Sequence, residues 1–199
     1  MDFFNSAYEG VPPWDIGRPQ KVIVRLAQDG EISGRVLDVG CGTGENALYL
    51  ASLGFEVWGI DAAQDAIKKA QDKAKKRGIK VKFLVSDALK LQLFRNKFDT
   101  IIDCGLFHVF SDEERPIFAA SLYSALRPGG KYFMLCFSEH EPGSYGPRRV
   151  TQAEIRETFS KGWRINYIRE AEFETMFGTQ GVKAWLSSIT IKSPSIIFM

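Results

Sequence analysis

Hydrophobic runs alternate with segments of helical periodicity from about residue 34 to the end of the chain. Short apolar runs with the length of buried strands lie at 34–39, 55–60, 81–85, 98–104 and 131–137. Apolar residues at helical spacing occupy the intervening segments 47–53, 67–74 and 111–126. Alternating strands and helices predict a mostly parallel sheet that is covered by helices on both faces.

The last quarter of the chain follows a different pattern. Thr151 and Glu154 have the spacing of a helical capping box, as do Ser111 and Glu114 before the preceding helix. Two strand-like stretches then follow with no helix between them, at 162–173 and 182–191. Because parallel neighbours need a long crossover, a short loop joins antiparallel strands. We therefore expect a doubly wound α/β fold, with a mostly parallel seven-stranded sheet and one antiparallel strand near the C-terminus.

Length and composition agree with one hydrophobic core. A chain of 199 residues is short for two domains, and its 45% hydrophobic and 25% charged content is that of an ordinary globular protein. We expect a single domain over 1–199, with an N-terminal lid or arm (1–20), a cofactor-binding half (34–137) and an acceptor-side half (138–199). The sequence leaves the oligomeric state open between a monomer and a homodimer.

Charge and cysteine content exclude several other classes. The formal net charge of +2 lacks the basic excess of a nucleic-acid-binding protein, so we expect no nucleic-acid partner. Cys41, Cys104 and Cys136 are odd in number and widely spaced, which favours reduced thiols over a disulfide framework or a metal site. No basic and apolar leader opens the chain, and no apolar run reaches about 18 residues, so we expect a cytoplasmic protein without a membrane segment.

The main chemical signal is the sequence Val-Leu-Asp-Val-Gly-Cys-Gly-Thr-Gly-Glu-Asn at 36–46. A strand enters a tight turn with glycines at 40, 42 and 44, and a helix follows. Such glycines allow the backbone to turn sharply and lie against a ligand, and the helix N-terminus presents free amides. The dinucleotide fingerprint G-x-G-x-x-G requires a sixth-position glycine, where this chain has Glu45. A nicotinamide-dependent oxidoreductase is therefore disfavoured.

Carboxylates follow successive predicted strands. Asp61 ends the second strand, where a carboxylate can accept both ribose hydroxyls of an adenosine. Asp87 follows the third strand, within Ser-Asp-Ala at 86–88, where it can read an adenine amino group. Each acid alone is more typical of a cap or a turn. Together with the segment 99–105, they indicate a ligand crevice at the carboxyl edge of the sheet.

These motifs together resemble the class I, Rossmann-like S-adenosylmethionine-dependent methyltransferases, over about residue 34 to the end. The resemblance implies S-adenosylmethionine as cofactor, with the glycine loop on its methionyl part, Asp61 on its ribose and Asp87-Ala88 beside its adenine. The cofactor-binding residues that it implies are Trp14, Asp38, Gly40, Cys41, Gly42, Thr43, Gly44, Asn46, Asp61, Ala62, Asp87, Ala88, Asp103 and Cys104.

The segment 8–20 adds a finer resemblance, to the lead-in of thiopurine, thiol/halide, tellurite-resistance and bacterial benzoquinoid methyltransferases. In those relatives the Pro-Trp segment folds over the cofactor as a lid. The alternative is a surface arm whose aromatic residues, Phe3, Phe4, Tyr8 and Trp14, pack on the core. An aromatic segment stiffened by two adjacent prolines suits closure over an apolar ligand, which favours the lid.

The acceptor is expected to be a small molecule that presents a phenolic or quinol oxygen or a thiol, because such groups ionise readily and need at most one base. His108 is the candidate catalytic base, although a histidine there more often completes a hydrogen-bond network. Tyr8, His140, Arg148 and Arg149 are candidate acceptor-binding residues. No metal is expected.

Two alternatives remain open. A degenerate fold would bind the cofactor without catalysing a reaction, although the intact glycines, Asp61 and Asp87 argue against this. A nucleic-acid or protein methyltransferase is disfavoured, because base-methylating enzymes carry Asn/Asp-Pro-Pro-aromatic where this chain has Asp-Cys-Gly-Leu at 103–106.

Overall fold

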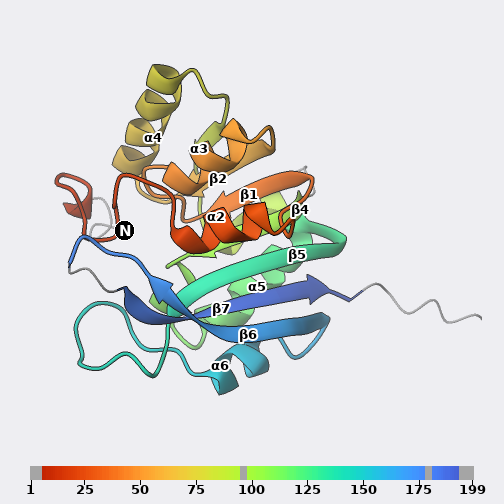
Figure 1. Ribbon diagram of the computed structural model, residues 1–199. Helices are drawn as coiled ribbons and strands as arrows, with labels where there is room; N and C mark the ends of the chain where they lie inside the picture. The colour runs from red at the N-terminus through yellow and green to blue at the C-terminus, as the bar shows by residue number, and fades with distance from the viewer. Residues whose placement is uncertain (1–5, 95–97, 178–180, 193–199) are drawn as a thin grey trace, which may run out of the picture.

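The computed structural model describes residues 6–94, 98–177 and 181–192, and its centre is a seven-stranded sheet in the order β3-β2-β1-β4-β5-β7-β6 (Figure 1). The strands are β1 (Arg35–Val39), β2 (Glu56–Asp61), β3 (Lys82–Val85), β4 (Phe98–Cys104), β5 (Leu126–Phe137), β6 (Trp163–Phe173) and β7 (Val182–Ile191). Strands β1 to β5 pair in parallel, and β7 runs antiparallel to both of its neighbours. The predicted fold class, including the one antiparallel strand, is confirmed.

Helices cover both faces of the sheet. The helical elements are α2 (Lys21–Gln28), α3 (Glu45–Ser52), α4 (Gln64–Arg77), η1 (Ala88–Leu93), η2 (Phe107–Val109), α5 (Glu114–Ala125) and α6 (Gln152–Thr158). One hydrophobic cluster joins the sheet to α2, α3 and α4, and a second joins it to α5, α6 and η1. The 3-10 segments η1 and η2 were not predicted from the sequence.

Two boundaries differ from the sequence-based expectation. Strand β5 begins at Leu126 instead of residue 131, because Leu126 already pairs with Phe98 before the register shifts at the Pro-Gly-Gly turn. Helix α5 begins at Glu114, after an irregular turn, and Pro116 therefore falls in its first turn, where a missing N–H is tolerated. The capping box forms as expected at Thr151–Glu154, whereas the reciprocal hydrogen bonds of Ser111 and Glu114 close the turn that precedes α5.

The strand order places the site. The order reverses between β1 and β4, so the loops that follow these strands diverge and leave a crevice at their carboxyl ends. The N-terminal segment before α2, the loop 138–150 and the β6–β7 connection reach this same edge, on the left in Figure 1. Within 6–94, 98–177 and 181–192, every helix is too short or too polar to cross a lipid bilayer. The domain boundaries, the oligomeric state, the cellular location and the absence of a nucleic-acid partner stay predictions.

Candidate active site

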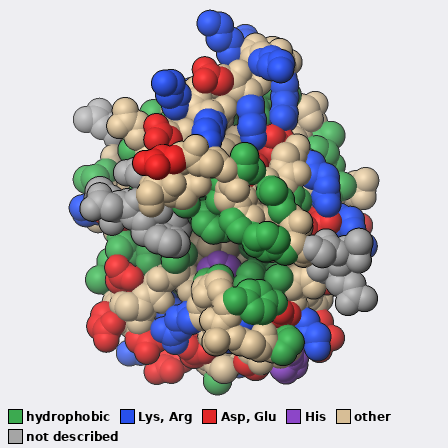
Figure 2. Space-filling view, turned by 90° about the vertical axis from the view of Figure 1, so that its left-hand side faces the viewer, with side chains coloured by type: hydrophobic (Ala, Val, Ile, Leu, Met, Phe, Trp, Pro, Cys, Tyr) green, Lys and Arg blue, Asp and Glu red, His purple; other side chains and the backbone are tan. Residues whose placement is uncertain are grey.

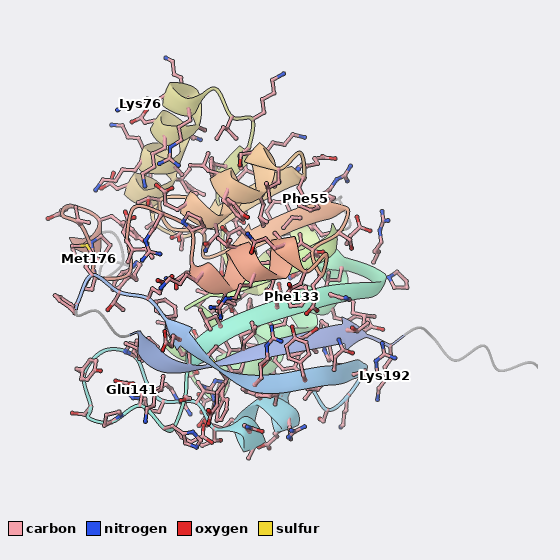
Figure 3. The ribbon with its side chains drawn as sticks, in the orientation of Figure 1. Phe55, Lys76, Phe133, Glu141, Met176 and Lys192 are labelled. Carbon is pink, nitrogen blue, oxygen red and sulfur yellow. The ribbon has the colours of Figure 1, made fainter. Side chains whose placement is uncertain are left out.

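A cavity of about 1280 Å³ opens at the carboxyl edge of the sheet. Figure 2 looks onto this edge and shows a hollow with a histidine at its floor and hydrophobic side chains around it. Glu141 and Met176, from the loop 138–150 and the β6–β7 connection, mark the same edge in Figure 3. The cavity exceeds the roughly 300–1,000 Å³ of a typical single-ligand site, so it has room for a cofactor and an acceptor together.

Most of the predicted cofactor-binding residues line this cavity. They are Trp14, Gly40, Cys41, Gly42, Thr43, Gly44, Asn46, Asp61, Ala62, Asp87, Ala88 and Cys104, and Tyr8 and His108 line it too. Loops far apart in the sequence thus meet here, because parallel strands deliver their carboxyl ends to one edge. We call the part of the cavity beside β1, β2 and β3 the cofactor half, and the part beside β4, β5 and the β6–β7 connection the acceptor half.

The glycine loop has the geometry that its sequence predicts. Gly42 has φ +53°, in the left-handed region, and an added Cβ would lie 2.8 Å from the hydroxyl oxygen of Tyr8. Glu45, at the position where a dinucleotide fingerprint has glycine, is tied to α4 by Lys73 Nζ at 2.8 Å and by a bidentate pair with Arg77. These cations hold the pKa of Glu45 below its ordinary value. The carboxylate therefore stabilises the glycine loop by joining it to two basic residues of α4.

Asp61 presents its carboxylate to the cavity. Its Oδ2 accepts a 2.9 Å hydrogen bond from the Gly42 N–H, and its Oδ1 accepts one of 2.9 Å from the Ala63 N–H. Burial raises the pKa of Asp61, and these amides lower it. Each oxygen keeps a further lone pair for a ligand hydroxyl. The arrangement fits a diol that donates its two hydroxyl groups to the carboxylate, such as the ribose expected from the sequence.

Asp38 is buried and does not line the cavity. Its Oδ2 has no hydrogen-bond partner within the described ranges. Burial raises the pKa of Asp38 well above its ordinary value, and the charges of Asp103 and Asp61 raise it further. A positive charge close to Asp38 would lower its pKa, because the charge would offset the cost of ionising a buried carboxyl group.

Asp103 corrects the sequence-based expectation, since its carboxylate is used within the protein. Oδ1 accepts from the Leu106 N–H at 2.7 Å, and Oδ2 accepts from the Phe107 N–H at 3.1 Å and the Tyr132 hydroxyl at 2.7 Å. Burial nevertheless raises the pKa of Asp103 to about 7. Asp103 is absent from the cavity wall and instead shapes the turn between β4 and η2. The neighbouring Cys104 does line the cavity, and burial raises the pKa of its thiol.

Asp87 lines the cavity with part of its carboxylate engaged. Oδ1 caps η1 by accepting from the Leu89 N–H at 2.9 Å, and Oδ2 pairs with Lys90 Nζ at 3.4 Å. The cap and the ligand-facing position are therefore compatible, and the two sequence interpretations of this acid do not exclude one another. Asn46 likewise has a double role, because its Oδ1 accepts from the Gln20 N–H at 2.9 Å while the residue lines the cavity.

The N-terminal segment lies over the glycine loop. Trp14 Nε1 donates to the Tyr8 hydroxyl at 3.0 Å, and Tyr8 is only 4% exposed. Lys69 Nζ on α4 donates to the carbonyl oxygens of Tyr8 at 2.5 Å and Gly10 at 2.9 Å. Thr43 Oγ1 donates to Asp15 Oδ2 at 2.8 Å. The segment thus covers the cofactor half, while Phe3 and Phe4 lie outside the described residues.

A second anchor of this segment has no signal in the sequence. Arg18 makes a bidentate pair with Glu174, with both distances at 3.0 Å, although the two residues are 156 positions apart. Gln20 exchanges two 2.9 Å hydrogen bonds with the backbone of Glu174, and the Met176 N–H donates to the Pro13 carbonyl oxygen at 2.8 Å. The β6–β7 connection and the N-terminal segment therefore form one continuous wall of the cavity.

His108 lines the cavity, and its ring is buried and hydrogen-bonded within the protein, which favours the network role over that of a catalytic base. Its Nδ1 accepts a 3.1 Å hydrogen bond from the Phe137 N–H, and the ring also hydrogen bonds to the Gly105 backbone. Burial, together with the charges of Arg115 and Arg149, lowers the pKa of His108 to about 3. The neutral imidazole therefore joins the ends of β4 and β5, the network role that the sequence left as its alternative.

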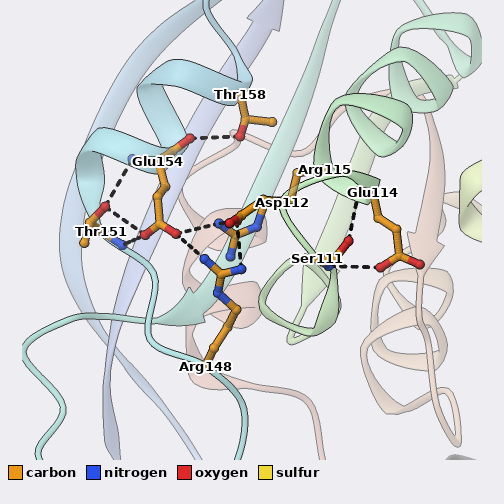
Figure 4. Close-up of polar contacts among 8 residues, drawn as sticks. All are labelled: Ser111, Asp112, Glu114, Arg115, Arg148, Thr151, Glu154 and Thr158. Carbon is orange, nitrogen blue, oxygen red and sulfur yellow. Dashed lines mark hydrogen bonds and ion pairs between the residues drawn. The ribbon is translucent and has the colours of Figure 1, made fainter.

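Three predicted acceptor-binding residues lie outside the cavity wall. Arg148 pairs with Asp112 at 2.8 Å and with Glu154, which also holds the buried Arg115 (Figure 4). Arg149 donates to carbonyl oxygens of its own loop, those of Glu141, Pro142, Gly143, Tyr145 and Pro147. His140 packs its ring edge-on against Trp185. These partners engage both guanidinium groups, so Arg148 and Arg149 stabilise the loop 138–150.

The acceptor half is mainly apolar, which sequence reasoning did not detect. Its lining includes Leu106, Val109, Phe110, Phe137, Pro142, Tyr145, Pro147, Phe173 and Phe177. These residues come from five segments, and only the fold brings them together. Within the described ranges, no group of three or more His, Cys, Asp or Glu side chains is placed to hold a metal ion.

Comparison with known proteins identifies similar sequences. Residues 36–130 match a family described as a methyltransferase domain. The chain is 39% identical over 182 residues to the 2-heptyl-1-hydroxyquinolin-4(1H)-one methyltransferase of Mycobacteroides abscessus, and the alignment covers 86% of this chain and 80% of that protein.

Solved structures with a similar fold are also found. One, from work on the conversion of a disulfide bond into a thioacetal group during echinomycin biosynthesis, is 35% identical with a TM-score of 0.87, over 96% of this chain and 91% of its own. The magnesium protoporphyrin IX methyltransferase of Synechocystis PCC 6803 with bound S-adenosylmethionine shares the fold, with 24% identity, a TM-score of 0.66, and coverage of 87% and 77%.

Proposed function

The chain belongs to the class I S-adenosylmethionine-dependent methyltransferases that act on small molecules, and we propose that its acceptor is an apolar aromatic compound with an acidic hydroxyl group. The observation that carries this proposal is the apolar acceptor half next to a buried histidine, whose Nδ1 already accepts from the Phe137 N–H and whose pKa burial lowers to about 3. Such a site suits an acceptor that ionises without help and binds through its ring.

The cavity residues fit the cofactor. Gly42 leaves room under Tyr8 that a side chain would fill, and Asp61 offers free lone pairs for the ribose hydroxyls. The buried Asp38 carboxyl, whose Oδ2 has no partner within the described ranges, would ionise more readily beside a ligand with a positively charged sulfonium. We assign the methionyl part to the glycine loop, the ribose to Asp61 and the adenine to the Asp87–Ala88 edge.

The reaction requires little chemistry from the protein. S-adenosylmethionine supplies an electrophilic methyl group. An acceptor oxygen that has lost its proton to solvent would take this methyl group, and the electron pair of the broken carbon–sulfur bond would remain on sulfur. The protein aligns the two reactants and excludes water. We assign this task to the Tyr8–Trp14 cover and to the aromatic residues Phe137 and Phe173.

The relative from Mycobacteroides abscessus supports this acceptor class, because its name specifies a hydroxyquinolone. A sulfur acceptor is the second candidate. A thiol also ionises near neutral pH, with an ordinary pKa of about 8.5, and suits the same apolar wall. The structure from echinomycin biosynthesis, which concerns sulfur chemistry, favours this candidate.

The test incubates the purified protein with S-adenosylmethionine and a panel of acceptors, and follows release of S-adenosylhomocysteine together with the mass of the product. The panel contains 2-heptyl-1-hydroxyquinolin-4(1H)-one, 1-naphthol, thiophenol and hexanethiol. We expect the highest kcat/KM with the hydroxyquinolone. Turnover of the two thiols alone would replace the oxygen acceptor with the sulfur one, and no turnover of any compound would contradict both.

A further inference from the structure

Large hydrophobic side chains remain exposed where the acceptor half meets solvent. Val109 is 39% exposed, Tyr145 59% and Phe177 71%, and all three line the cavity. They come from η2, from the loop 138–150 and from the β6–β7 connection. We call these three residues the apolar rim. Exposed apolar side chains that converge on a cavity mouth mark a binding surface more often than isolated ones do.

The apolar rim continues an apolar wall that begins deep in the cavity. The rings of His108 and Phe137 meet edge-on with centroids 4.9 Å apart, and Phe137 and Phe173 meet with centroids 5.4 Å apart. Phe137 and Phe173 are both about 5% exposed or less. The wall therefore runs from the floor, where the reacting group must lie, to the rim at the surface.

Polar groups next to this wall are engaged inside the protein. The Tyr145 hydroxyl donates to Glu141, whose other carboxylate oxygen accepts from the Lys183 N–H at 2.8 Å. The Arg149 guanidinium lies over the rings of Phe137 and Tyr145, at 5.4 and 5.2 Å from their centroids, and donates to loop carbonyls. Tyr145 thus presents its ring, not a free hydroxyl, to a ligand. This arrangement suits hydrocarbon and gives a second polar group of the acceptor little to bind.

We propose that the apolar rim binds an alkyl chain that the acceptor carries on its aromatic ring. The inference rests on the proposed function and specifies its substrate class. A ring at the floor leaves its substituent directed along the wall to the mouth, where the chain covers the exposed faces of Val109 and Phe177. Since the rim opens to solvent, longer chains gain contact gradually and meet no back wall.

The first measurement varies the chain length. The acceptors are 1-hydroxyquinolin-4(1H)-ones with methyl, pentyl, heptyl or nonyl groups at position 2. Each buried methylene contributes up to about 0.8 kcal/mol, so kcat/KM is expected to rise at least about tenfold from the methyl to the heptyl compound. Equal kcat/KM across the series would overturn the inference.

The second measurement removes the rim. In Phe177→Ser and Val109→Ser, the ratio of kcat/KM for the heptyl and methyl compounds is expected to fall to about one third or less, because apolar contact is lost. Leu93→Ser is the matched control for Phe177→Ser, since Leu93 is 73% exposed and lies outside the cavity wall. Its ratio should equal that of the unmodified protein. An unchanged ratio in both rim variants would exclude the rim as the chain site.

A binding assay separates this inference from the proposed reaction. The compound 2-heptylquinolin-4(1H)-one lacks the 1-hydroxyl group and is compared with 2-methylquinolin-4(1H)-one by calorimetry, with S-adenosylhomocysteine present. Tighter binding of the heptyl compound that is lost in Phe177→Ser supports the chain site even if no hydroxyquinolone is methylated. Methylation of hydroxyquinolones without any chain-length effect on binding or rate supports the reaction and rejects the chain site.

Discussion

The hydroxyl oxygen of Tyr8 lies 2.8 Å from the point that a Cβ atom on Gly42 would occupy. Gly42 belongs to the loop between β1 and α3, and Tyr8 belongs to the N-terminal segment, whose described residues 6–20 contribute no strand to the sheet. The same hydroxyl accepts from Trp14, so the contact joins the glycine loop to both aromatic residues of the cover. Tyr8 therefore occupies its place over the loop only because Gly42 has no side chain.

Replacement of Gly42 should disrupt cofactor binding. Gly42→Val adds a branched side chain at φ +53° and against Tyr8, so the affinity for S-adenosylhomocysteine should fall by at least about tenfold. Calorimetric titration measures the affinity. Gly30→Val is the matched control, because Gly30 has φ +69° with nothing within 4 Å of an added Cβ. An affinity of Gly42→Val equal to that of Gly30→Val would show that the glycine loop does not contact the ligand.

Removal of the Asp61 carboxylate should weaken the same complex. Asp61→Ala is expected to cost about 1.5–3 kcal/mol of cofactor binding free energy, the usual contribution of hydrogen bonds to a charged group. Asp61→Asn keeps one oxygen and should lose less. Asp65→Ala, an exposed acid on α4, provides the control. Unchanged titration curves for Asp61→Ala would place the ribose elsewhere.

Release of the N-terminal segment should reduce catalysis more than stability. Lys69→Met removes the cation that holds the carbonyl oxygens of Tyr8 and Gly10. We expect kcat to fall by about tenfold or more, because cover segments of this kind exclude water and complete the acceptor pocket. The melting temperature should change by no more than a few degrees. The neighbouring exposed Lys68→Met is the control.

Truncation of residues 1–16 tests the same role more severely. A folded protein that binds the cofactor but has little transferase activity agrees with a lid. The buried Tyr8 packs with Ala63 and Ala66, and a core role for this segment would instead cost about 3–5 kcal/mol of folding free energy for each buried aromatic residue. Thermal melts with and without cofactor distinguish the two outcomes.

His108 should make stability depend on pH. Its pKa is about 3 in the folded protein and about 6.5 when unfolded, so the unfolded chain binds more protons between these values. Its contribution is complete above about pH 6.5 and decreases as the pH falls towards about 3. Between pH 7 and pH 5 the loss is about 2 kcal/mol.

The measurement compares urea unfolding of the unmodified protein and of His108→Asn at pH 5 and pH 7. Burial raises the pKa of Asp103 to about 7, so the folded protein binds more protons at Asp103 than the unfolded chain does between about pH 3.9 and about pH 7. The contribution of Asp103 to stability therefore decreases as the pH rises from 5 to 7, opposite to that of His108. The difference between the two proteins removes the Asp103 contribution. An identical pH dependence in both would mean that His108 titrates normally.

The sequence alone was sufficient for the fold class and for the glycine loop. The strand at Arg35–Val39, the turn glycines and the helix from Glu45 depend on apolar periodicity and on backbone preferences of adjacent residues. The position of Asp61 at a strand end also follows from this local pattern. Local interactions determine these features, so they can be derived without knowledge of distant contacts.

The tertiary structure decided which of the predicted side chains face the cavity. Asp61 ends β2 and Asp103 lies one residue before the end of β4, yet Asp103 accepts from Tyr132 inside the protein and Asp61 lines the cavity. His108 becomes neutral because Phe137, 29 positions away, donates to its Nδ1 and the surrounding core excludes water. Glu174 binds Arg18 across 156 positions. Burial and charge at a side chain depend on atoms that the fold brings together, and these atoms have no fixed spacing along the chain.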